Sequence, residues 1–317
     1  MKLLITATSF KSDRPSPVLE KLKQFADELV FNPLGRPLTE DELLPLLGGC
    51  DGYIAGLDFV TKKVIDACPE LRVISRYGAG VDRVDLAAAR ARGILVCNTP
   101  GANAQAVADL ALALMLAVAR KIPMLDRKTR EGQWVRSSGT ELFGKTLGIL
   151  GLGAVGKAVA QRARGFSMRI LAYDPFINKQ YAEEQGIIPS DFDVLIEEAD
   201  IITLHLPLDQ NTMGIININT MTRMKQGVIL INTARGGLID EEAANTLLRS
   251  GHLGGLGLDA YAEEPPGKSP LFELDNVVLT PHTASHTSEA TANMAAMSVQ
   301  NLIDILSGKD CPYIVNK

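Results

Sequence analysis

The chain has 317 residues, of which 46% are hydrophobic, and its 32 basic and 37 acidic residues give a net charge of -5. This length allows two domains with sizeable cores. No basic stretch and no interleaving of aromatic with basic residues occurs in the sequence, so we exclude a nucleic acid partner.

The N-terminal residues 2–7 are apolar over too short a run for a signal peptide, and they predict a first strand. The four cysteines form no CxxC pair, and no histidine lies at metal-ligand spacing from them. This pattern predicts reduced, mostly buried thiols of a cytoplasmic protein and no bound metal. The cysteines are Cys50, Cys68, Cys97 and Cys311.

Short apolar runs alternate with helical patterns along the chain, which is typical of doubly wound α/β folds. In the N-terminal third, no run is followed by a glycine-rich fingerprint, so we expect no nucleotide site there. The predicted strands of this first sheet are 2–7, 28–31, 52–55, 72–75 and 93–96.

Proline and glycine in the segment 98–101 mark the predicted crossing between two domains. The following stretch, 102–119, is rich in alanine and leucine, but Gln105 and Asp109 interrupt it, so we predict a buried helix and no membrane span. The helix pattern over 103–120 is apolar around most of its circumference. It therefore predicts a homodimer built on the second domain.

Six further runs predict a Rossmann sheet in the second half: 146–150, 169–173, 201–205, 228–231, 255–259 and 276–279. The helix pattern 289–306 follows the last of these strands, and we expect it to return to the first domain. The predicted domains are a discontinuous flavodoxin-like substrate domain, residues 1–100 and 289–317, and a Rossmann nucleotide-binding domain, residues 101–288.

A GxGxxG run, 151–156, follows the first Rossmann strand directly. A GxGxxG alone is a weak signal, because glycine turns also serve to pack helices on strands. Here Gly151 permits the tight turn, Gly153 lets the backbone approach a pyrophosphate, and Gly156 lets the next helix pack on the strand. The position of the run between a strand and a helix predicts a dinucleotide site.

Asp174 closes the next apolar run, where a carboxylate accepts hydrogen bonds from the ribose diol of a dinucleotide. A 2'-phosphate would meet this carboxylate, and Pro175 and Phe176 supply no compensating arginine. The sequence therefore predicts NAD in preference to NADP.

Polar residues follow three of the Rossmann strands, at the edge where such sheets bind ligands. Arg235 follows the run 228–231, two glutamates follow 255–259, and His282 follows 276–279. Oxidation of a hydroxy acid needs these three types. A histidine takes the alcohol proton, a carboxylate orients the ring and favours the imidazolium, and an arginine holds the substrate carboxylate with a bidentate fork.

Position alone leaves the choice between Glu263 and Glu264 open. Of the four histidines, His282 is the predicted base. His286 is its rival, and we prefer His282 because it lies closer to the end of the strand 276–279. His252 lies in a predicted surface turn, and His205 ends a strand beside the cofactor edge.

At these residues the chain resembles the D-isomer-specific 2-hydroxyacid dehydrogenases, and within that family it is most similar to the D-3-phosphoglycerate dehydrogenases. The resemblance covers almost the whole chain. It is carried by 76–82 (RYGAGVD), 98–103 (NTPGAN), 139–142 (GTEL), 144–149 (GKTLGI), 205–208 (HLPL), 224–227 (MKQG), 232–237 (NTARGG), Asp259 with 263–266 (EEPP), and 280–282 (TPH).

The resemblance implies Arg235, Glu264 and His282 as the catalytic residues, and it thereby selects Glu264 over Glu263. It also implies backbone amides of 78–80 at the substrate carboxylate. The predicted cofactor contacts are Gly151, Gly153, Ala154, Val155, Gly156, Asp174, Pro175, His205, Pro207, Thr212, Thr233, Ala234, Arg235, Asp259 and His282. The predicted substrate contacts are Arg76, Gly78, Ala79, Gly80, Asn103, Arg136 and Arg235.

The sequence departs from the family pattern at three places. Ala154 and Val155 stand where the family usually has Arg and Ile, so one contact to the pyrophosphate is missing, and Asp109 replaces the usual Glu. No regulatory domain follows Lys317 in this sequence, so we expect no serine feedback through such a domain.

The resemblance implies an NAD-dependent 2-hydroxyacid dehydrogenase that acts on 3-phosphoglycerate. Arg76 and Arg136 are the candidate cations for the phosphate of that substrate. A glyoxylate or hydroxypyruvate reductase is the alternative within the family, because the catalytic residues do not fix the substrate tail. A binding protein similar to NAD-sensing corepressors is the alternative from another class.

Overall fold

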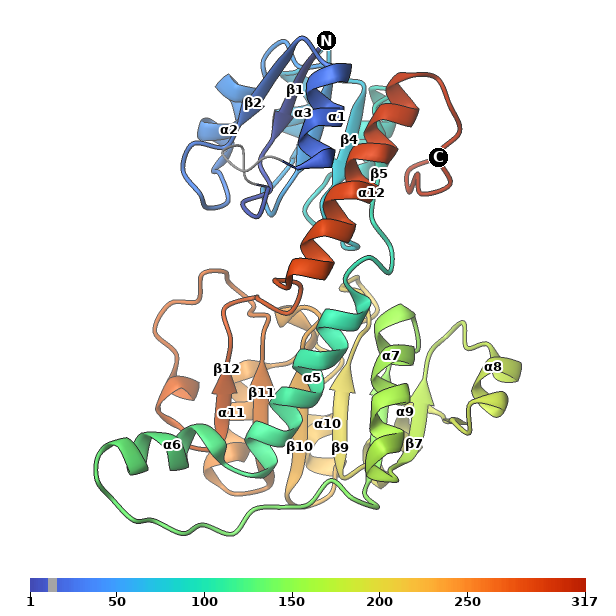
Figure 1. Ribbon diagram of the computed structural model, residues 1–317. Helices are drawn as coiled ribbons and strands as arrows, with labels where there is room; N and C mark the ends of the chain where they lie inside the picture. Colours follow the sequence, from blue (N-terminus) through green and yellow to red (C-terminus); the bar gives the residue numbers. More distant parts are fainter. Residues whose placement is uncertain (11–15) are drawn as a thin grey trace. The chain divides into compact units, whose positions relative to one another are not determined.

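The chain forms two compact units in the computed structural model, which describes residues 1–10 and 16–317. Unit 1 consists of residues 1–103 and 286–317 and contains both ends of the chain, and unit 2 consists of residues 104–285 (Figure 1). Each unit contains one parallel sheet with helices packed on it. This architecture confirms the predicted α/β class.

The sheet of unit 1 has the strand order β2-β1-β3-β4-β5, which is the order of flavodoxin-like folds. Its strands are β1 (Lys2–Ile5), β2 (Glu28–Phe31), β3 (Gly52–Ala55), β4 (Val73–Arg76) and β5 (Leu95–Cys97). Its helices are α1 (Pro17–Phe25), α2 (Glu40–Leu47), α3 (Lys62–Asp66), α4 (Leu86–Ala91) and α12 (Ser288–Leu306). The C-terminal helix α12 packs on this sheet, with Leu302 and Leu306 in one cluster with Leu3 and Ile54.

The C-terminal residues of the chain lie along the edge strand β5. Val315 donates its backbone N–H to the carbonyl of Val96 at 2.8 Å. The buried side chain of Asn316 accepts from the amide of Val96 and donates to the carbonyl of Ile94, each at 2.8 Å. These bonds satisfy backbone groups that an open sheet edge would expose.

The sheet of unit 2 has the order β12-β11-β10-β9-β6-β7-β8, with the reversal of a Rossmann fold at β6 and β9. Its strands are β6 (Thr146–Leu150), β7 (Arg169–Tyr173), β8 (Ile188–Pro189), β9 (Ile201–Leu204), β10 (Val228–Asn232), β11 (Leu253–Leu258) and β12 (Val277–Leu279). Its helices are α5 (Ala104–Ala119), α6 (Ile122–Arg130), α7 (Ala154–Ala163), α8 (Lys179–Glu184), α9 (Phe192–Glu198), α10 (Ile218–Arg223) and α11 (Glu241–Arg249).

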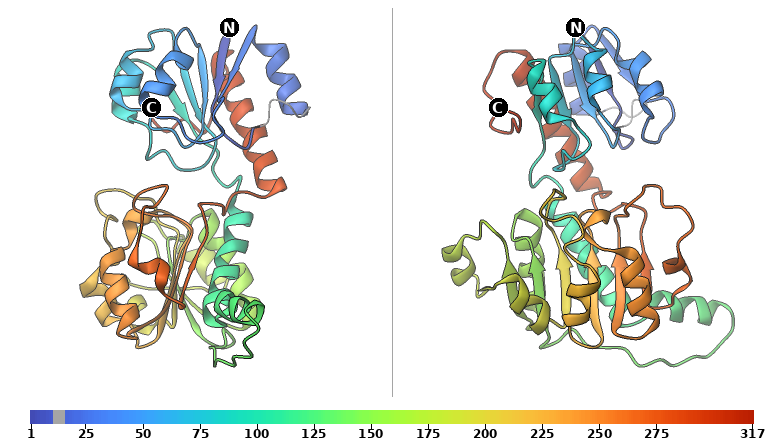
Figure 2. Two further views of the ribbon diagram at one scale, coloured as in Figure 1. Left: turned by 90° about the vertical axis from the view of Figure 1, so that its left-hand side faces the viewer. Right: turned by 180° about the vertical axis from the view of Figure 1, so that it is seen from behind.

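Both faces of the unit 2 sheet are covered by helices. Helices α5 and α7 lie on one face, and α9, α10 and α11 lie on the other (Figures 1 and 2). Alternate residues of a strand point to opposite faces. Ile229 and Ile231 accordingly pack beneath α5, whereas Leu230 packs on the opposite side. This double burial explains why the strands are continuous apolar runs.

Helix α5 is buried within its own unit, and this changes the argument for a dimer. Val118 and Leu114 of α5 pack directly against Gly255 and Gly257 of β11. The apolar circumference of α5 is therefore used largely by the core of unit 2, and it no longer argues by itself for a partner. No described helix is long and apolar enough to cross a membrane.

Candidate active site

The glycine-rich loop joins β6 to α7, and its glycines meet three different demands. A Cβ at Gly156 would lie 2.1 Å from the carbonyl oxygen of Gly151, so only glycine lets α7 approach the loop this closely. Gly151 has φ +99° and packs against the backbone of His205. Gly153 caps the N-terminus of α7, and a Cβ there would meet no atom within 4 Å. Open space therefore lies at a helix N-terminus, where an anion is favoured.

Asp174 follows β7 and connects the glycine-rich loop to the next turn. Its Oδ2 accepts a hydrogen bond from the amide of Leu152, and its Oδ1 accepts one from the amide of Phe176, both at 2.8 Å. The carboxylate is half-buried and thus held in one orientation beside the loop.

A buried hydroxyl supports the fit of a dinucleotide at this edge of the sheet. Thr233 follows β10, and its Oγ1 is buried without a hydrogen-bond partner among the residues that the structure describes. Buried hydroxyls are normally bonded, so this atom is suited to a polar group of a ligand. Together with the glycines and Asp174, the residues present fit a dinucleotide.

We expect Asp174→Ala to erode the preference for NAD over NADP. The substitution removes both the acceptor for a ribose diol and the negative charge that repels a 2'-phosphate. The measurement is kcat/KM with NADH and with NADPH. Asp174→Asn is the matched control, because it removes the charge and keeps one acceptor oxygen. An unchanged ratio of the two cofactors in both variants would contradict the role of Asp174.

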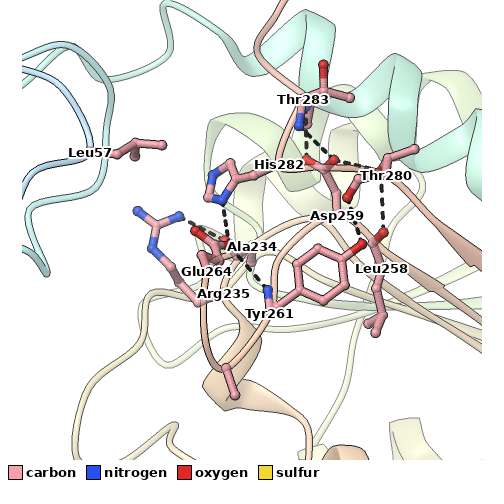
Figure 3. Close-up of polar contacts among 12 residues, drawn as sticks. Leu57, Ala234, Arg235, Leu258, Asp259, Tyr261, Glu264, Thr280, His282 and Thr283 are labelled. Atoms are coloured by element: carbon pink, nitrogen blue, oxygen red, sulfur yellow. Dashed lines mark hydrogen bonds and ion pairs between the residues drawn. The ribbon is translucent and has the colours of Figure 1, made fainter. Parts of the chain in front are cut away.

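His282 and Glu264 form a hydrogen-bonded pair (Figure 3). Their atoms Nδ1 and Oε1 lie 2.7 Å apart, and the side chains are 27% and 14% exposed. His282 lies in the tight turn after β12 and has φ +48°, a region that residues with side chains rarely adopt. Strain of this kind persists where the surroundings fix it, often at functional sites.

Tyr261 links the segment that carries Glu264 to the segment that carries His282. Its backbone N–H donates to Glu264 Oε1 at 3.2 Å, and its hydroxyl donates to the carbonyl of Thr280 at 2.8 Å (Figure 3). Burial, reinforced by Asp259, raises the pKa of Tyr261 to about 12, so the hydroxyl remains a donor at neutral pH. No motif in the sequence predicts this role of Tyr261.

Asp259 holds the loop around His282 with both of its oxygens. Oδ1 accepts from the hydroxyl of Thr280 at 2.6 Å and from the amide of Thr283 at 2.8 Å, and Oδ2 accepts from the amide of Ala284 at 2.9 Å. Asp259 is 1% exposed. The structure thus shows that Asp259 anchors this loop, whereas the sequence analysis predicted a contact with the cofactor for this residue.

Arg235 follows β10, and its Nη1 donates to the carbonyl of Ala234 at 2.8 Å. The buried Asn232 shapes this loop, because its side chain accepts from the amide of Ala234 and donates to the carbonyl of Arg235. Strands β10, β11 and β12 are neighbours in the sheet, so Arg235, Glu264 and His282 are carried by segments that leave the same edge (Figure 3).

The remaining histidines and Glu263 have other surroundings. His286 is exposed and belongs to unit 1, whereas His282 belongs to unit 2. His252 contacts the carbonyl of Met221 at 2.9 Å. Glu263 is exposed, and it is Glu264 that contacts His282. The geometry therefore favours the pair Glu264 and His282.

We expect Glu264→Gln to lower kcat/KM by about tenfold or more, because glutamine cannot stabilise the imidazolium that forms on His282 and holds its ring less firmly. Glu263→Gln is the matched control, since Glu263 is exposed, and its kcat/KM should equal that of the wild type. An unchanged kcat/KM in Glu264→Gln would count against the pair.

His205 directly follows β9, and its Nε2 lies 3.0 Å from the hydroxyl of Thr203. Burial lowers the pKa of His205 from 6.5 to about 3. The unfolded chain therefore binds a proton in this pH window that the folded chain does not bind, and stability falls as the pH falls from 6.5 toward 3. Between about pH 7 and pH 4.5, we expect the Tm of the His205→Gln variant to fall less than the Tm of the wild type. Equal losses would contradict this prediction.

Arg76 does not lie where the sequence suggested. It is the last residue of β4, it is 3% exposed, and it donates to the carbonyls of Ala55 and Gly80. The prediction of an accessible cation at Arg76 is wrong, because the strand extends one residue further and turns the side chain into unit 1. Arg136 is exposed in the segment after α6, as a solvent-facing cation.

The other predicted contacts lie at the ends of strands and in loops. Thr212 donates to the carbonyl of Pro207 at 2.7 Å and closes that turn. Pro175 is exposed after Asp174, and Ala154 and Val155 form the first residues of α7. Asn103 is the last residue of the first segment of unit 1. Within residues 1–10 and 16–317, no group of His, Cys, Asp and Glu could hold a metal ion.

Comparisons with known proteins show which proteins this chain is similar to. A D-3-phosphoglycerate dehydrogenase of Archaeoglobus fulgidus is 45% identical over 81% of this chain and 49% of its own length. A glyoxylate reductase of Thermofilum pendens is 41% identical over 96% of this chain and 92% of its own length. The crystal structure of a glyoxylate reductase from Paecilomyes thermophila has a TM-score of 0.86 and 29% identity, and the match covers 98% of this chain and 97% of that chain.

The chain spans about half the length of the D-3-phosphoglycerate dehydrogenases that it matches, 49% and 51% for two of them. Residues 112–284 match the model of the D-isomer specific 2-hydroxyacid dehydrogenase, NAD binding domain. Unit 2 is thus an NAD-binding domain, which confirms the predicted cofactor, NAD. The chain belongs to the family of D-isomer specific 2-hydroxyacid dehydrogenases.

Proposed function

We propose that the protein is an NAD-dependent oxidoreductase that interconverts a D-2-hydroxy acid and its 2-oxo acid. The observation that carries the proposal is the 2.7 Å contact between His282 Nδ1 and Glu264 Oε1, at the carboxyl edge of an NAD-binding sheet. Because Nδ1 is used by Glu264, we assign the proton transfer to Nε2. This atom takes the hydroxyl proton of the substrate in oxidation and returns it in reduction.

The other residues of the site have binding and orienting roles in this proposal. NAD, when bound, supplies the hydride acceptor for the carbon that carries the hydroxyl group. Glu264 orients the ring of His282 and stabilises the imidazolium that forms. Arg235 binds the substrate carboxylate with its planar fork and polarises the carbonyl of a 2-oxo acid. We assign unit 1 the role of substrate domain, with backbone amides of its 78–81 loop as the group that binds the carboxylate.

We propose 3-phosphoglycerate as the substrate. Relatives named D-3-phosphoglycerate dehydrogenase are 45% and 42% identical to this chain, which supports the choice. Arg136 is the candidate cation for the phosphate. Its side chain is exposed, and it carries the positive charge that a phosphate ester needs.

Glyoxylate or hydroxypyruvate is a second candidate substrate, and the burial of Arg76 favours it. Only one of the two cations expected for a phosphate is accessible within its unit. A relative named glyoxylate reductase is also matched over 92% of its own length.

The test compares kcat/KM with NADH for 3-phosphohydroxypyruvate, hydroxypyruvate and glyoxylate. The proposal expects the phosphorylated acid to be preferred by about tenfold or more, since a charged hydrogen bond contributes roughly 1.5–3 kcal/mol. Arg136→Ala should lower this preference, and Arg130→Ala, an exposed arginine paired with Asp126, is the matched control. Equal kcat/KM values would select the reductase alternative. Turnover of none of the acids would favour an NAD-sensing binding protein.

We propose that the protein is a homodimer in which a second copy covers exposed apolar residues of α6 and the segment after it. Ile122 is 51% exposed, Trp134 84% and Phe143 69%. Large apolar side chains that gather on one segment mark interaction surfaces. Sedimentation at micromolar concentration should give the mass of a dimer, and a monomeric mass would contradict this proposal.

We also propose a cytoplasmic location. The four cysteines are free and buried. Burial raises the pKa of Cys97 to about 12 and that of Cys50 to about 11, so these thiols stay protonated at neutral pH. Unpaired, inert thiols fit a reducing compartment, and fractionation of cells would test the location.

A further inference from the structure

The loop after β4 has three consecutive carbonyl groups, and each of them accepts a hydrogen bond from another part of unit 1. The amide of Thr99 donates to the carbonyl of Gly78 at 3.0 Å. Asn98 Nδ2 donates to the carbonyl of Ala79 at 2.7 Å, and Arg76 Nε donates to the carbonyl of Gly80 at 3.1 Å. The loop is thus fixed peptide by peptide.

Fixing these carbonyls also fixes the amides that follow them. In a planar trans peptide the C=O and the next N–H point in opposite directions. The amides of Ala79, Gly80 and Val81 are therefore directed away from their anchors, and no backbone carbonyl of the described residues accepts a hydrogen bond from them. Gly78 has φ +148°, and a Cβ there would meet nothing within 4 Å. Successive backbone amides that have no backbone acceptor can together bind an anion.

The side chain of Arg76 is buried in unit 1 and is held there by hydrogen bonds. Besides Gly80, it donates through Nη1 to the carbonyl of Ala55 at the end of β3, at 2.8 Å. Burial raises the pKa of Tyr53, and the charge of Arg76 partly offsets this rise. The hydroxyl of Tyr53 donates to the buried carboxylate of Asp58 at 2.8 Å. A buried guanidinium needs such surroundings, because an unpaired buried charge is costly. One side chain thereby ties the loop to the ends of two strands.

Asn98 is itself held by two segments from the C-terminal part of the chain. Its amide donates to the carbonyl of Tyr313 at 3.3 Å, and its carbonyl accepts from Asn301 Nδ2 of α12 at 2.9 Å. The peptide groups on both sides of the residue are thus fixed. The side-chain amide of Asn98 remains available to donate to the carbonyl of Ala79.

We propose that Arg76 and Asn98 are positioning residues that orient the amides of residues 79–81 toward the carboxylate of the substrate. This inference rests on the proposed function. It gives Arg76 a role that needs no phosphate, since Nε and Nη1 donate to backbone carbonyls. Loss of either side chain frees the loop and weakens binding of the carboxylate that every 2-oxo acid has.

The experiment measures kcat and KM for hydroxypyruvate and for 3-phosphohydroxypyruvate in Arg76→Lys and Asn98→Asp. Lysine keeps the positive charge but lacks the planar guanidinium that donates to two carbonyls at once. Aspartate keeps the shape of asparagine, but its carboxylate cannot donate a hydrogen bond to the carbonyl of Ala79. We expect KM to rise about tenfold for both substrates by the same factor, as loss of a hydrogen bond of about 1.4 kcal/mol predicts. The value of kcat should stay within about threefold, because the carboxylate is bound equally in ground and transition states.

Arg72→Lys is the matched control, because Arg72 is exposed just before the same strand and should leave KM unchanged. The Kd of NADH, measured by fluorescence, should be unchanged in all variants, which separates loop positioning from general damage. A KM that rises only for the phosphorylated acid would make Arg76 a phosphate ligand and overturn the inference. Unchanged KM in Asn98→Asp would overturn it as well, even if Arg76→Lys failed to fold. A wild type that turns over no 2-oxo acid would instead overturn the proposed function.

Discussion

His282→Asn should lower kcat by about 10²–10⁴, because a positioned general base is typically worth this factor. Asparagine cannot exchange a proton, but it tolerates positive φ better than most residues. The turn at φ +48° should therefore survive the substitution, and the loss will report chemistry. Binding of NAD should stay nearly unchanged, because the glycine-rich loop and Asp174 lie on other strands of the sheet.

The measurement is kcat with a saturating 2-oxo acid, together with the Kd of NADH. His286→Asn is the matched control, because His286 is exposed and lies in the other unit. It should keep the wild-type rate. If His286→Asn removes activity and His282→Asn does not, the base is misassigned.

Gly236→Ala should disrupt the site without touching a catalytic side chain. A Cβ at this position would lie 1.8 Å from the backbone carbon of Tyr261, in the segment that carries Glu264. Backbone cannot move aside as a flexible side chain can, so the 260–264 segment must shift. Tyr261 then no longer holds Glu264 and Thr280 together, and we expect kcat/KM to fall about tenfold or more. Overpacking of this kind also costs about 3 kcal/mol of stability.

Gly237→Ala is the matched control one residue away. A Cβ there would meet only the side chain of Leu208, at 3.2 Å, and that side chain can give way. The two variants should thus differ in Tm by about 5 °C or more, since about 1 kcal/mol moves Tm by 2–4 °C in a domain of this size. Equal Tm and equal kcat/KM in both variants would show that the close approach at Gly236 is unimportant for the site.

Most strands were predictable because buried parallel strands are continuous apolar runs bounded by turn residues. The run 169–173 appears as β7 with its predicted bounds. Strand β8 was missed because its two residues, Ile188 and Pro189, are exposed at the edge of the sheet and show no pattern. The pairing of the C-terminal residues with β5 was also missed, since it joins segments far apart in the sequence.

The candidate catalytic residues were accessible to sequence reasoning for a physical reason. Parallel strands place their carboxyl ends at one edge, so residues that follow neighbouring strands are brought together. The hydrogen bonds that position these residues could not be predicted from the sequence. The role of Asp259 depends on three contacts more than twenty residues away in sequence, and no local pattern encodes them. Arg76 was misplaced because a shift of one residue in a strand end changes where the side chain points.

The configuration of the product tests the central claim most directly. The purified protein, given NADH and a 2-oxo acid, should oxidise NADH and release the D-2-hydroxy acid, as chiral chromatography of the product would show. Formation of the L isomer, or no oxidation of NADH with any of the three acids above, would contradict the assignment of His282, Glu264 and Arg235 to a D-2-hydroxyacid dehydrogenase site.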